Sequence, residues 1–398
     1  MSQRSETDAI IIGGGISGLS LAHALLAQGR AVTVLEREAR VGGALHSIRP
    51  AEGFWLELGG HTGYNSYGRL LAIVEQLGLR DALLRRETSR WMLWHGGRAV
   101  SVPSRLRWLE LARSLPWLLA GRGEEETVAD YYGRVLGRRN FEQVLRPMFS
   151  AVVSQDAAQI PAALLFKKRP RRKDLPRSFA FAGGLQSIAE AIAAQPGLSM
   201  RAGTGAAAVA RAGAAWRVTM PDGSVLEAPV LALTTAPDAA AALLAHAAPE
   251  AAAALGALEV ATLETEGVVL RAEQVKLAPM AGLVGVEAPF RSVVTRDTVG
   301  HAQFRGFAFH FRPESPPAER AAQMAAVLGC APEHFEHRIT VRRTLPSPRP
   351  GHAARIARLD AALAGQHLLV TGNFFGGLAI EDCVGRSAAE AERLAAQR

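Results

Sequence analysis

Residues near the start of the chain have the types and spacing that dinucleotide binding requires. A G-x-G-x-x-G pattern is formed by Gly13, Gly15, Ile16, Ser17 and Gly18. Between a strand and a helix, such glycines permit a tight turn, the close approach of a diphosphate and the packing of helix on strand, while the first helical N–H groups face the anion. Glu36 follows about 20 residues later, where a carboxylate can accept hydrogen bonds from ribose hydroxyls. These residues predict a dinucleotide site, the alternative being a glycine-rich turn beside an incidental glutamate.

A second glycine turn, Arg40-Val41-Gly42-Gly43, comes directly after the expected second strand. It resembles a feature of the large flavoprotein group related to amine oxidases, and this resemblance favours FAD over NAD. In physical terms, the Arg40 guanidinium and the amides of Gly42 and Gly43 can donate further hydrogen bonds to the diphosphate.

Longer stretches resemble the protoporphyrinogen and coproporphyrinogen oxidases, FAD enzymes that aromatise porphyrinogens late in haem synthesis. These stretches are Glu57-Leu-Gly59 with Arg69 to Leu79, Glu126-Thr-Val-Ala-Asp-Tyr-Tyr132 with Arg146-Pro-Met148, Phe181-Ala-Gly-Gly-Leu185, and Gly372-Asn-Phe-Phe-Gly-Gly-Leu-Ala-Ile-Glu-Asp-Cys383. The last stretch is the most family-specific and resembles the flavin-facing C-terminal motif. The resemblance spans most of the chain and implies FAD, a small-molecule substrate, specifically a carboxylated tetrapyrrole, and O2 as the final acceptor.

The resemblance also implies which residues contact FAD. Residues 377–380 should bring backbone amides near the flavin pyrimidine, where negative charge develops during reduction. Ala206 replaces a valine whose backbone faces the adenine, and a backbone contact survives that change. The expected FAD-binding set is Gly13, Gly15, Ile16, Ser17, Gly18, Glu36, Arg37, Arg40, Gly42, Gly43, Ala44, Leu45, Gly59, Gly60, His61, Thr62, Ala206, Gly372, Asn373, Gly377, Leu378, Ala379 and Ile380.

Two side chains are candidates for the substrate site. Arg69 aligns with an arginine that meets a substrate propionate in the family, and a guanidinium can bind a carboxylate through two parallel hydrogen bonds. The alternative is a solvated arginine in the first turn of a helix. His61 lies near the expected flavin edge and is a candidate proton acceptor, although a histidine in a glycine loop is more often structural. No acid–base dyad is expected, because orienting the substrate and excluding water can supply much of the rate.

The chain departs from the family pattern in two places. The family has Gly-Pro after the equivalent of Leu58, whereas this chain has Gly59-Gly60-His61. The segment between Pro161 and Phe181 is condensed and strongly basic. Its basic residues are Lys167, Lys168, Arg169, Arg171, Arg172 and Lys173. A solvated loop is one interpretation, and a surface that attracts an acidic substrate or a membrane is the other.

The elements that position these residues predict an α/β fold with an α+β insert: a Rossmann-type FAD-binding domain, a mixed-sheet substrate domain and a helical insert. A strand at 8–12, a helix at 19–26 and a strand at 31–35 form a βαβ unit. A terminal helix is expected beyond Cys383. We expect FAD-binding segments at 1–80, 181–240 and 346–398, substrate-domain segments at 81–103 and 241–345, and the insert, a candidate for membrane association, at 104–180.

Composition excludes several classes of protein. The 398 residues are 48% hydrophobic and 21% charged, which is typical of soluble globular proteins. No run of about 18 apolar residues appears, and the first residues lack the pattern of a secretory leader, so we expect a cytoplasmic protein or one peripheral on the inner face of the membrane. Cys330 and Cys383 have no metal-ligand spacing, so no metal site is expected. The net charge of +8 comes mostly from arginine and matches no nucleic-acid-binding module, so no nucleic-acid partner is expected.

The favoured function is a porphyrinogen oxidase in which a bridge carbon gives a hydride to FAD and ring N–H groups lose protons. A flavin amine oxidase is an alternative, disfavoured because Glu264, Thr265 and Glu266 stand where amine oxidases place a flavin-adjacent lysine. A desaturase or tailoring oxidase of a biosynthetic pathway is a second alternative. A non-catalytic membrane-associated flavoprotein is the third, since Arg105-Leu-Arg-Trp108 and Leu115-Pro-Trp-Leu-Leu119 mix basic and interfacial residues.

Overall fold

The computed structural model describes residues 7–123 and 125–397, and its fold is α/β, as expected from the sequence. The first βαβ unit lies where the glycine pattern predicts it. It consists of β1 (Ala9–Ile12), α1 (Ile16–Ala27) and β2 (Val32–Glu36). Both strands are continuously buried, as strands of a parallel sheet covered on two faces must be.

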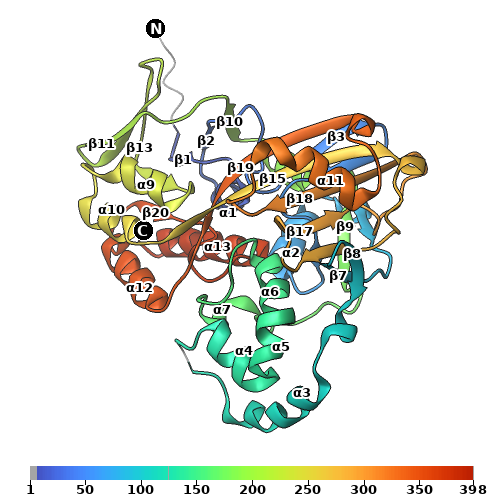
Figure 1. Cartoon of the computed structure of the whole chain (residues 1–398). Coiled ribbons are helices and arrows are strands. Elements are labelled where there is room, and N and C mark those ends of the chain that lie inside the picture. Colours follow the sequence, from blue (N-terminus) through green and yellow to red (C-terminus); the bar gives the residue numbers. More distant parts are fainter. Residues whose placement is uncertain (1–6, 124, 398) are drawn as a thin grey trace.

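These strands belong to a five-stranded parallel sheet assembled from distant parts of the chain (Figure 1). Its order is β10 (Leu198–Ala202), β2, β1, β14 (Val230–Leu233) and β20 (Leu368–Val370). One face packs on α1 and α13 (Ile380–Ala395). The opposite face packs on α9 (Pro237–Leu244), α10 (Pro249–Gly256), α12 (His352–Leu363) and a small sheet of β11 (Ala208–Ala212), β12 (Ala215–Thr219) and β13 (Val225–Ala228).

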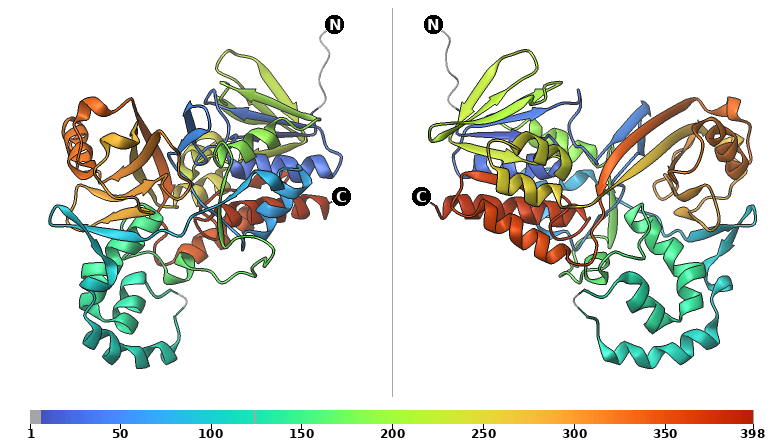
Figure 2. Two further views of the ribbon diagram at one scale, coloured as in Figure 1. Left: turned by 90° about the vertical axis from the view of Figure 1, so that its right-hand side faces the viewer. Right: turned by 60° about the vertical axis from the view of Figure 1, so that its left-hand side comes forward.

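A seven-stranded mixed sheet forms the second body of the molecule, and Figure 2 shows it beside the first. Its order is β19 (His337–Pro346), β15 (Val260–Arg271), β18 (Phe304–Phe311), β17 (Phe290–Thr295), β16 (Gly282–Gly285), β7 (Trp91–His95) and β8 (Arg98–Ser101). One face packs on α11 (Arg320–Leu328). The other face, here called the inner face, packs on Phe54, Leu56 and Leu58 of the β4 segment.

Shorter elements join the two bodies. They are β3 (Ser47–Ala51) with β4 (Phe54–Glu57), the three-stranded sheet of β5 (Gly63–Tyr64), β9 (Ser178–Phe181) and β6 (Leu83–Arg85), and the helices α2 (Gly68–Gln76) and α8 (Gln186–Ala193). The division of the chain into FAD-binding, substrate and insert segments stays a prediction.

The helical insert projects from the lower side of the molecule in Figure 1. It contains α3 (Trp108–Ser114), α4 (Val128–Leu136), α5 (Arg138–Asn140), a π-helical turn (Phe141–Leu145), α6 (Arg146–Val153) and α7 (Ala162–Leu165). Thr127 caps α4 by accepting a hydrogen bond from the amide of Asp130 at 3.1 Å. The insert has its own core, and Leu378 of the C-terminal motif packs against that core.

Within residues 7–123 and 125–397, no helix combines the length and apolarity needed to cross a membrane. The same described residues contain no group of three or more His, Cys, Asp or Glu side chains that could hold a metal ion.

Candidate active site

The first glycine turn is packed so tightly that side chains are excluded. A Cβ atom on Gly18 would lie 2.0 Å from the carbonyl oxygen of Gly13, and one on Gly13 would lie 2.6 Å from Oγ1 of Thr234. Gly13 also has a φ of +115°, which disfavours any other residue. Thr234 holds the turn by donating to the carbonyl of Gly13 at 2.8 Å. The pattern is therefore required by the backbone path itself.

The start of α1 and the end of β2 together form an anion and hydroxyl site. Gly15 is the N-cap of α1 and has no side chain to satisfy the first helical N–H groups, which therefore remain available to a diphosphate. At the end of β2, Glu36 accepts hydrogen bonds from the amides of Gly14 at 2.7 Å and Glu38 at 2.8 Å. These bonds hold the carboxylate beside the turn, where ribose hydroxyls can reach it.

The second glycine turn lies directly against the first. The amide of Gly42 donates to the carbonyl of Gly14 at 2.8 Å, and a Cβ atom on Gly43 would lie 3.0 Å from the Cα of Gly15. Arg40 pairs with Glu38 at 2.8 Å and donates to the carbonyl of Gly43 at 3.0 Å. The guanidinium therefore organises the turn, in addition to any contact with an anion.

Arg343 of β19 is part of this turn, although sequence reasoning missed it. Its Nη1 donates to the carbonyl of Gly43 at 2.7 Å, and its Nη2 donates to Nδ1 of His46 at 2.9 Å. Burial and the nearby Arg40 lower the pKa of Arg343 to about 10. Burial, Arg40 and Arg343 lower the pKa of His46 to about 4, so His46 is a neutral acceptor. Arg343 ties the large sheet to the nucleotide loops.

The residues present fit FAD at its nucleotide end. The loop before β11 lies against the end of β2, because the amide of Thr204 donates to the carbonyl of Glu36 at 2.8 Å. Ala206 follows in this loop, and Arg37 lies against Gly205, where an added Cβ atom would meet the arginine stem at 3.4 Å. The glycine turns, the start of α1, Glu36 and the loop before β11 therefore lie at one edge of the parallel sheet, as the predicted dinucleotide site requires.

The C-terminal motif brings a second helix start to the same region. The structure begins α13 at Ile380, so the expectation of a helix only beyond Cys383 was wrong by one turn. The reason is that Asp382 lies over its own helix start and accepts from the amide of Ala379 at 3.3 Å. A Cβ atom on Gly377 would lie 2.4 Å from the Asp382 carboxylate, which explains this glycine. Gly372 and Asn373 form the turn between β20 and this motif.

The loop at residues 59–62 joins the glycine turn to the C-terminal motif. A Cβ atom on Gly59 would lie 2.0 Å from the carbonyl oxygen of Ala44, and one on Gly60 would lie 2.9 Å from Leu45 and 3.6 Å from Ile380. The glycines that replace the family's Gly-Pro therefore allow three segments to converge. This convergence is where a flavin ring bound in the family's manner would lie.

His61 is held in this loop by contacts with Thr62, which in turn contacts Arg86. Arg86 donates to Oγ1 of Thr62, and that oxygen lies 2.7 Å from Nδ1 of His61. Burial, Arg86 and the neighbouring His310 lower the pKa of His61 to about 3, so its imidazole is neutral. A cavity of about 30 Å³ adjoins the ring and is also lined by Glu57, Arg86 and Arg296. His61 thus lines a small cavity together with residues of the large sheet, and its roles as a proton acceptor and as an FAD contact stay predictions.

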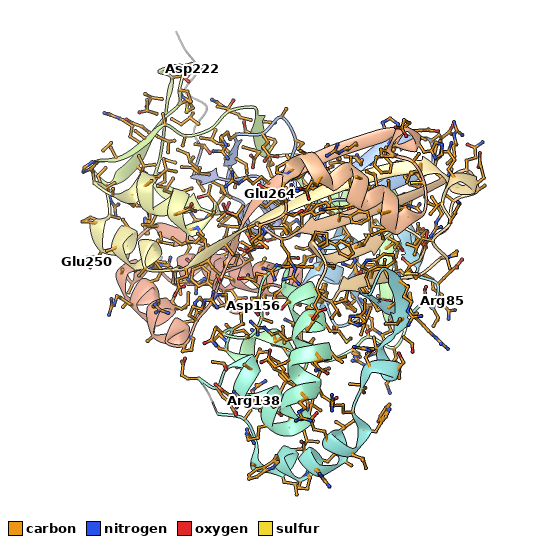
Figure 3. The ribbon with its side chains drawn as sticks, in the orientation of Figure 1. Arg85, Arg138, Asp156, Asp222, Glu250 and Glu264 are labelled. Atoms are coloured by element: carbon orange, nitrogen blue, oxygen red, sulfur yellow. The ribbon has the colours of Figure 1, made fainter. Side chains whose placement is uncertain are left out.

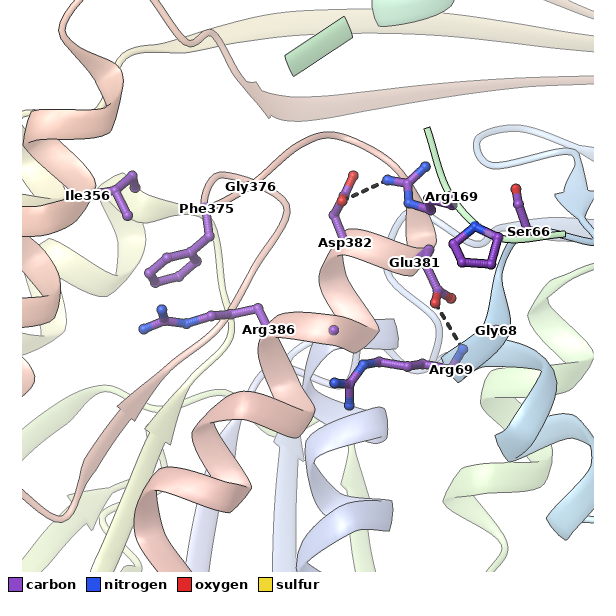
Figure 4. A pocket seen from close by; sticks show the side chains of 12 residues that line it. Ser66, Gly68, Arg69, Arg169, Ile356, Phe375, Gly376, Glu381, Asp382 and Arg386 are labelled. Atoms are coloured by element: carbon purple, nitrogen blue, oxygen red, sulfur yellow. Dashed lines mark hydrogen bonds and ion pairs between the residues drawn. The ribbon is translucent and has the colours of Figure 1, made fainter. Parts of the chain in front are cut away.

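Arg69 lies outside this cluster. Its guanidinium is 53% exposed and reaches Glu392 of α13 at 3.7 Å, while its amide donates to Glu381 at 2.9 Å. It lines an open groove of about 670 Å³ with Arg169 and Arg386, and Figure 4 shows Glu381 between Arg69 and Arg169. The groove borders the outer side of the C-terminal motif, and a role of Arg69 in substrate binding stays a prediction.

The basic segment is only partly solvated. Arg169 pairs with Asp382 at 2.7 Å, Lys167 donates to the carbonyl of Gly376, and Arg172 pairs with Glu75 at 2.7 Å. These contacts fasten the segment across α2 and the start of α13. Half of its six basic side chains therefore have a structural role that the charge pattern alone did not reveal.

Comparison with known proteins fits this geometry. The family model described as flavin containing amine oxidoreductase matches residues 16–281, which is more than half of the chain. This chain belongs to that family. It is therefore an FAD-dependent oxidoreductase of the amine oxidase superfamily.

Relatives inside the family include both candidate activities. Chloroplastic protoporphyrinogen oxidase of Oryza sativa subsp. japonica is 31% identical over 204 residues, which cover 47% of this chain and 38% of the rice protein. Putrescine oxidase of Kocuria rosea is 42% identical over 82 residues, which cover 21% of this chain and 17% of that enzyme. The chain thus matches less than two fifths of the length of either relative, and the substrate and the pathway are matters for proposal.

Solved structures agree on the fold across the whole length. A crystal structure from Exiguobacterium sp. 255-15, provisionally named a protoporphyrinogen oxidase, has a TM-score of 0.80 with 19% identity and covers 100% of both chains. Cyclohexylamine oxidase from Brevibacterium oxydans IH-35A has a TM-score of 0.69 with 17% identity, covering 98% of this chain and 100% of that chain. At these identities the likeness establishes the architecture alone.

Proposed function

We propose that this protein oxidises a porphyrinogen, a carboxylated tetrapyrrole, with O2 as the final electron acceptor. The observation that carries the proposal is the extent of similarity: the match to plant protoporphyrinogen oxidase covers 47% of the chain, against 21% for the match to putrescine oxidase. The proposed cellular place is the cytoplasm or the inner face of a membrane.

The inner face of the large sheet supports this choice over amine oxidation. Of the three residues that stand where amine oxidases place a lysine, Glu264 and Glu266 turn to the opposite face and pair with Arg320 of α11. Figure 3 labels Glu264 on its long strand. Only Thr265 faces inward, where its hydroxyl contacts His310. Because no lysine stands at this inward position, the site suits a substrate whose oxidation depends on correct orientation and on exclusion of water.

Bound FAD would supply the two-electron acceptor for a hydride from the substrate carbon. The chain's own residues do the rest. The glycine turns and Glu36 hold the nucleotide end, while Leu378 and the core of the insert close one side of the flavin region against water. Burial and the nearby Arg86 keep the imidazole of His61 neutral, so it adds no positive charge to this region.

Product formation under air tests this proposal. The purified, FAD-loaded protein is mixed with coproporphyrinogen III and protoporphyrinogen IX in separate reactions, and porphyrin fluorescence and hydrogen peroxide are followed together. We expect about three peroxides for each porphyrin, since six electrons leave in three two-electron steps. Putrescine and cyclohexylamine serve as amine probes. Peroxide from an amine, with no porphyrin from either porphyrinogen, would replace this proposal by amine oxidation.

We further propose that the tip of the insert contacts an anionic membrane surface. Its exposed apolar residues, here called the tip patch, are Trp108, Leu109, Leu115, Trp117, Leu118 and Leu119. Exposed arginines at 105, 107 and 113 flank them. The one glutamate in the segment, Glu110, is engaged inside, accepting from the amide of Arg139 at 2.9 Å. Apolar anchors surrounded by cations fit an anionic bilayer interface.

Sedimentation with vesicles tests the tip patch. Full-length protein should pellet at low salt with vesicles of phosphatidylglycerol and phosphatidylcholine, and less with phosphatidylcholine alone. The double variant Trp117→Glu, Leu119→Glu should stay in the supernatant. Val225→Glu is the matched control, because Val225 is 48% exposed on β13, outside the tip patch, and it should pellet like the parent. Wild-type protein that stays in solution with both vesicle types would end the membrane proposal.

A further inference from the structure

Three uncharged or neutral polar side chains form a row across the inner face of the large sheet, near Arg343 of the same face. Thr265 on β15, His310 on β18 and Ser292 on β17 are direct cross-strand neighbours, because Thr265 pairs with His310 and His310 pairs with Ser292 in the register. Their neighbours along the same face, Val294 and Ala308, pack into the apolar cluster around β4. The three polar residues thus lie side by side on neighbouring strands, next to apolar residues of the same face.

Each member of the row is buried, at 0% exposure for Thr265, 5% for His310 and 1% for Ser292. Thr265 Oγ1 lies 2.8 Å from Nδ1 of His310. Within the described residues, the hydroxyl of Ser292 has no hydrogen-bond partner. Burying a polar group without a partner costs about 1–3 kcal/mol, so a bound ligand that hydrogen-bonds to the Ser292 hydroxyl would remove this cost.

His61 lies close to the row, in the loop at residues 59–62, and it interacts electrostatically with His310. Nδ1 of His61 lies 2.7 Å from Oγ1 of Thr62, and the same oxygen accepts a hydrogen bond from Arg86. These contacts hold the imidazole of His61 in place beside the row.

We propose that His310 is the catalytic base, accepting at Nε2 the proton of a substrate N–H group while Thr265 holds its Nδ1–H and Ser292 anchors the same substrate edge. The role of His310 depends on the proposed function in one respect. The substrate must carry a C–H carbon bonded to a ring that carries an N–H group. The carbon loses a hydride, with its two electrons, to FAD. The N–H loses a proton to His310, and a new double bond forms between the two units.

The charges around His310 suit a base that accepts its proton as the hydride leaves and then releases that proton readily. Burial and Arg343 lower the pKa of His310 to about 4, so the ring is neutral before reaction. His61 and Arg343 are the titratable or charged groups that face it. As the hydride leaves, positive charge develops on the substrate and its N–H becomes strongly acidic, so a weak base suffices to take the proton in the same step. The proton then leaves easily, because the imidazolium lies near the Arg343 guanidinium.

Single-turnover kinetics provide the first test. In the FAD-loaded protein mixed anaerobically with porphyrinogen, His310→Ala should slow bleaching of the flavin absorbance by about 10²- to 10³-fold at unchanged FAD content. Added imidazole should restore at least a tenth of the lost rate, which a merely structural histidine would not show. Thr265→Val should slow bleaching by about tenfold. His334→Ala, a half-buried histidine on the 3-10 turn Pro332–His334, is the matched control and should behave as the parent does. A His310→Ala protein with full FAD content and a parental rate overturns the proposal.

A second readout needs no substrate. In FAD-loaded protein labelled with ¹³Cε1-histidine, photoreduction places negative charge on the flavin. We expect one histidine resonance to move to the imidazolium position on reduction and to be missing in His310→Gln. If reduction leaves every His310-dependent resonance in place, His310 is not beside the flavin and the assignment falls. A parent protein inert to porphyrinogens yet positive in this experiment would contradict the proposed function while retaining His310 as the base for another donor.

Discussion

The two glycine turns predicted to bind FAD and the polar row on the large sheet are built in opposite ways. In the turns, residues 13–18 and 42–43 are contiguous in sequence, and their work is done by backbone amides that only glycines leave accessible. In the polar row, residues 265, 292 and 310 come from three strands and act through side chains. Recognition by backbone amides therefore depends on a short, contiguous sequence motif. Recognition by side chains depends on the register of the sheet, because a slip of one residue would move each side chain of the strand to the other face.

This contrast predicts that the polar row tolerates substitution better than the glycine turns do. A side chain added to the turns collides with backbone that has no room to move. A side chain removed from the row leaves a small cavity in a sheet that otherwise keeps its apolar packing. We expect substitutions in the turns to remove FAD, and substitutions in the row to leave FAD bound while slowing its reduction.

The largest loss of stability and of FAD is expected from a substitution at Gly18. If neither loss occurred, the contrast between the glycine turns and the polar row would be wrong. In Gly18→Ala the new Cβ atom would lie 2.0 Å from the carbonyl oxygen of Gly13. We expect a loss of about 3 kcal/mol or more in the free energy of unfolding and a flavin content at least tenfold below the parent, measured by denaturation and by absorbance after desalting. Gly133→Ala on α4 meets nothing within 4 Å and should keep its FAD. Normal flavin content in Gly18→Ala would mean that the turn is not the diphosphate site.

The second largest effect is a pH dependence of stability caused by Glu57, a buried acid at the end of β4. It accepts hydrogen bonds from Ser47 at 2.6 Å and from the amide of Leu185 at 2.7 Å. Burial nevertheless raises its pKa from 4.5 to about 7, against the opposing pull of these bonds and of Arg49 and Arg296. The acid is therefore neutral in the folded chain at pH values where the unfolded chain has already ionised it.

The sign of the pH dependence follows. The contribution of Glu57 to stability is complete below pH 4.5 and is lost as pH rises to about 7, by about 3 kcal/mol in total. Glu57→Gln imitates the neutral acid, so its advantage over the parent should grow between those pH values and stay constant above them. Urea denaturation at several pH values measures this difference. A gap between the two proteins that does not change with pH would show that Glu57 ionises normally in the fold.

The smallest effect on stability is expected from a substitution of Arg69, which lies outside the glycine turns and the polar row. Arg69 has a half-exposed, long ion pair with Glu392, so Arg69→Ala should change the free energy of unfolding by less than about 0.5 kcal/mol. If its predicted contact with a substrate carboxylate is right, the KM for a porphyrinogen should rise about tenfold, with kcat and FAD content unchanged. Arg80→Ala, with similar 51% exposure, is the control. Equal KM values in both variants would remove Arg69 from the substrate site.

The sequence predicted what is local. The βαβ unit, the glycine turns and the family itself could be predicted from contiguous motifs. It missed Arg343, which reaches Gly43 from 300 residues away, and it placed the start of α13 one turn late because the carboxylate of Asp382 folds back over the helix start. His310 left one weak signal: it is a lone histidine in the aromatic strand FRGFAFHF, at an inward position.

Anaerobic reduction of the flavin by its substrate tests the central claim most directly. The FAD-loaded protein is mixed in a stopped-flow instrument with coproporphyrinogen III or protoporphyrinogen IX, and the oxidised flavin absorbance is followed with porphyrin fluorescence. The proposal predicts rapid bleaching with at least one porphyrinogen, together with growth of fluorescence. A flavin that stays oxidised with both, but is bleached by putrescine or cyclohexylamine, would contradict it.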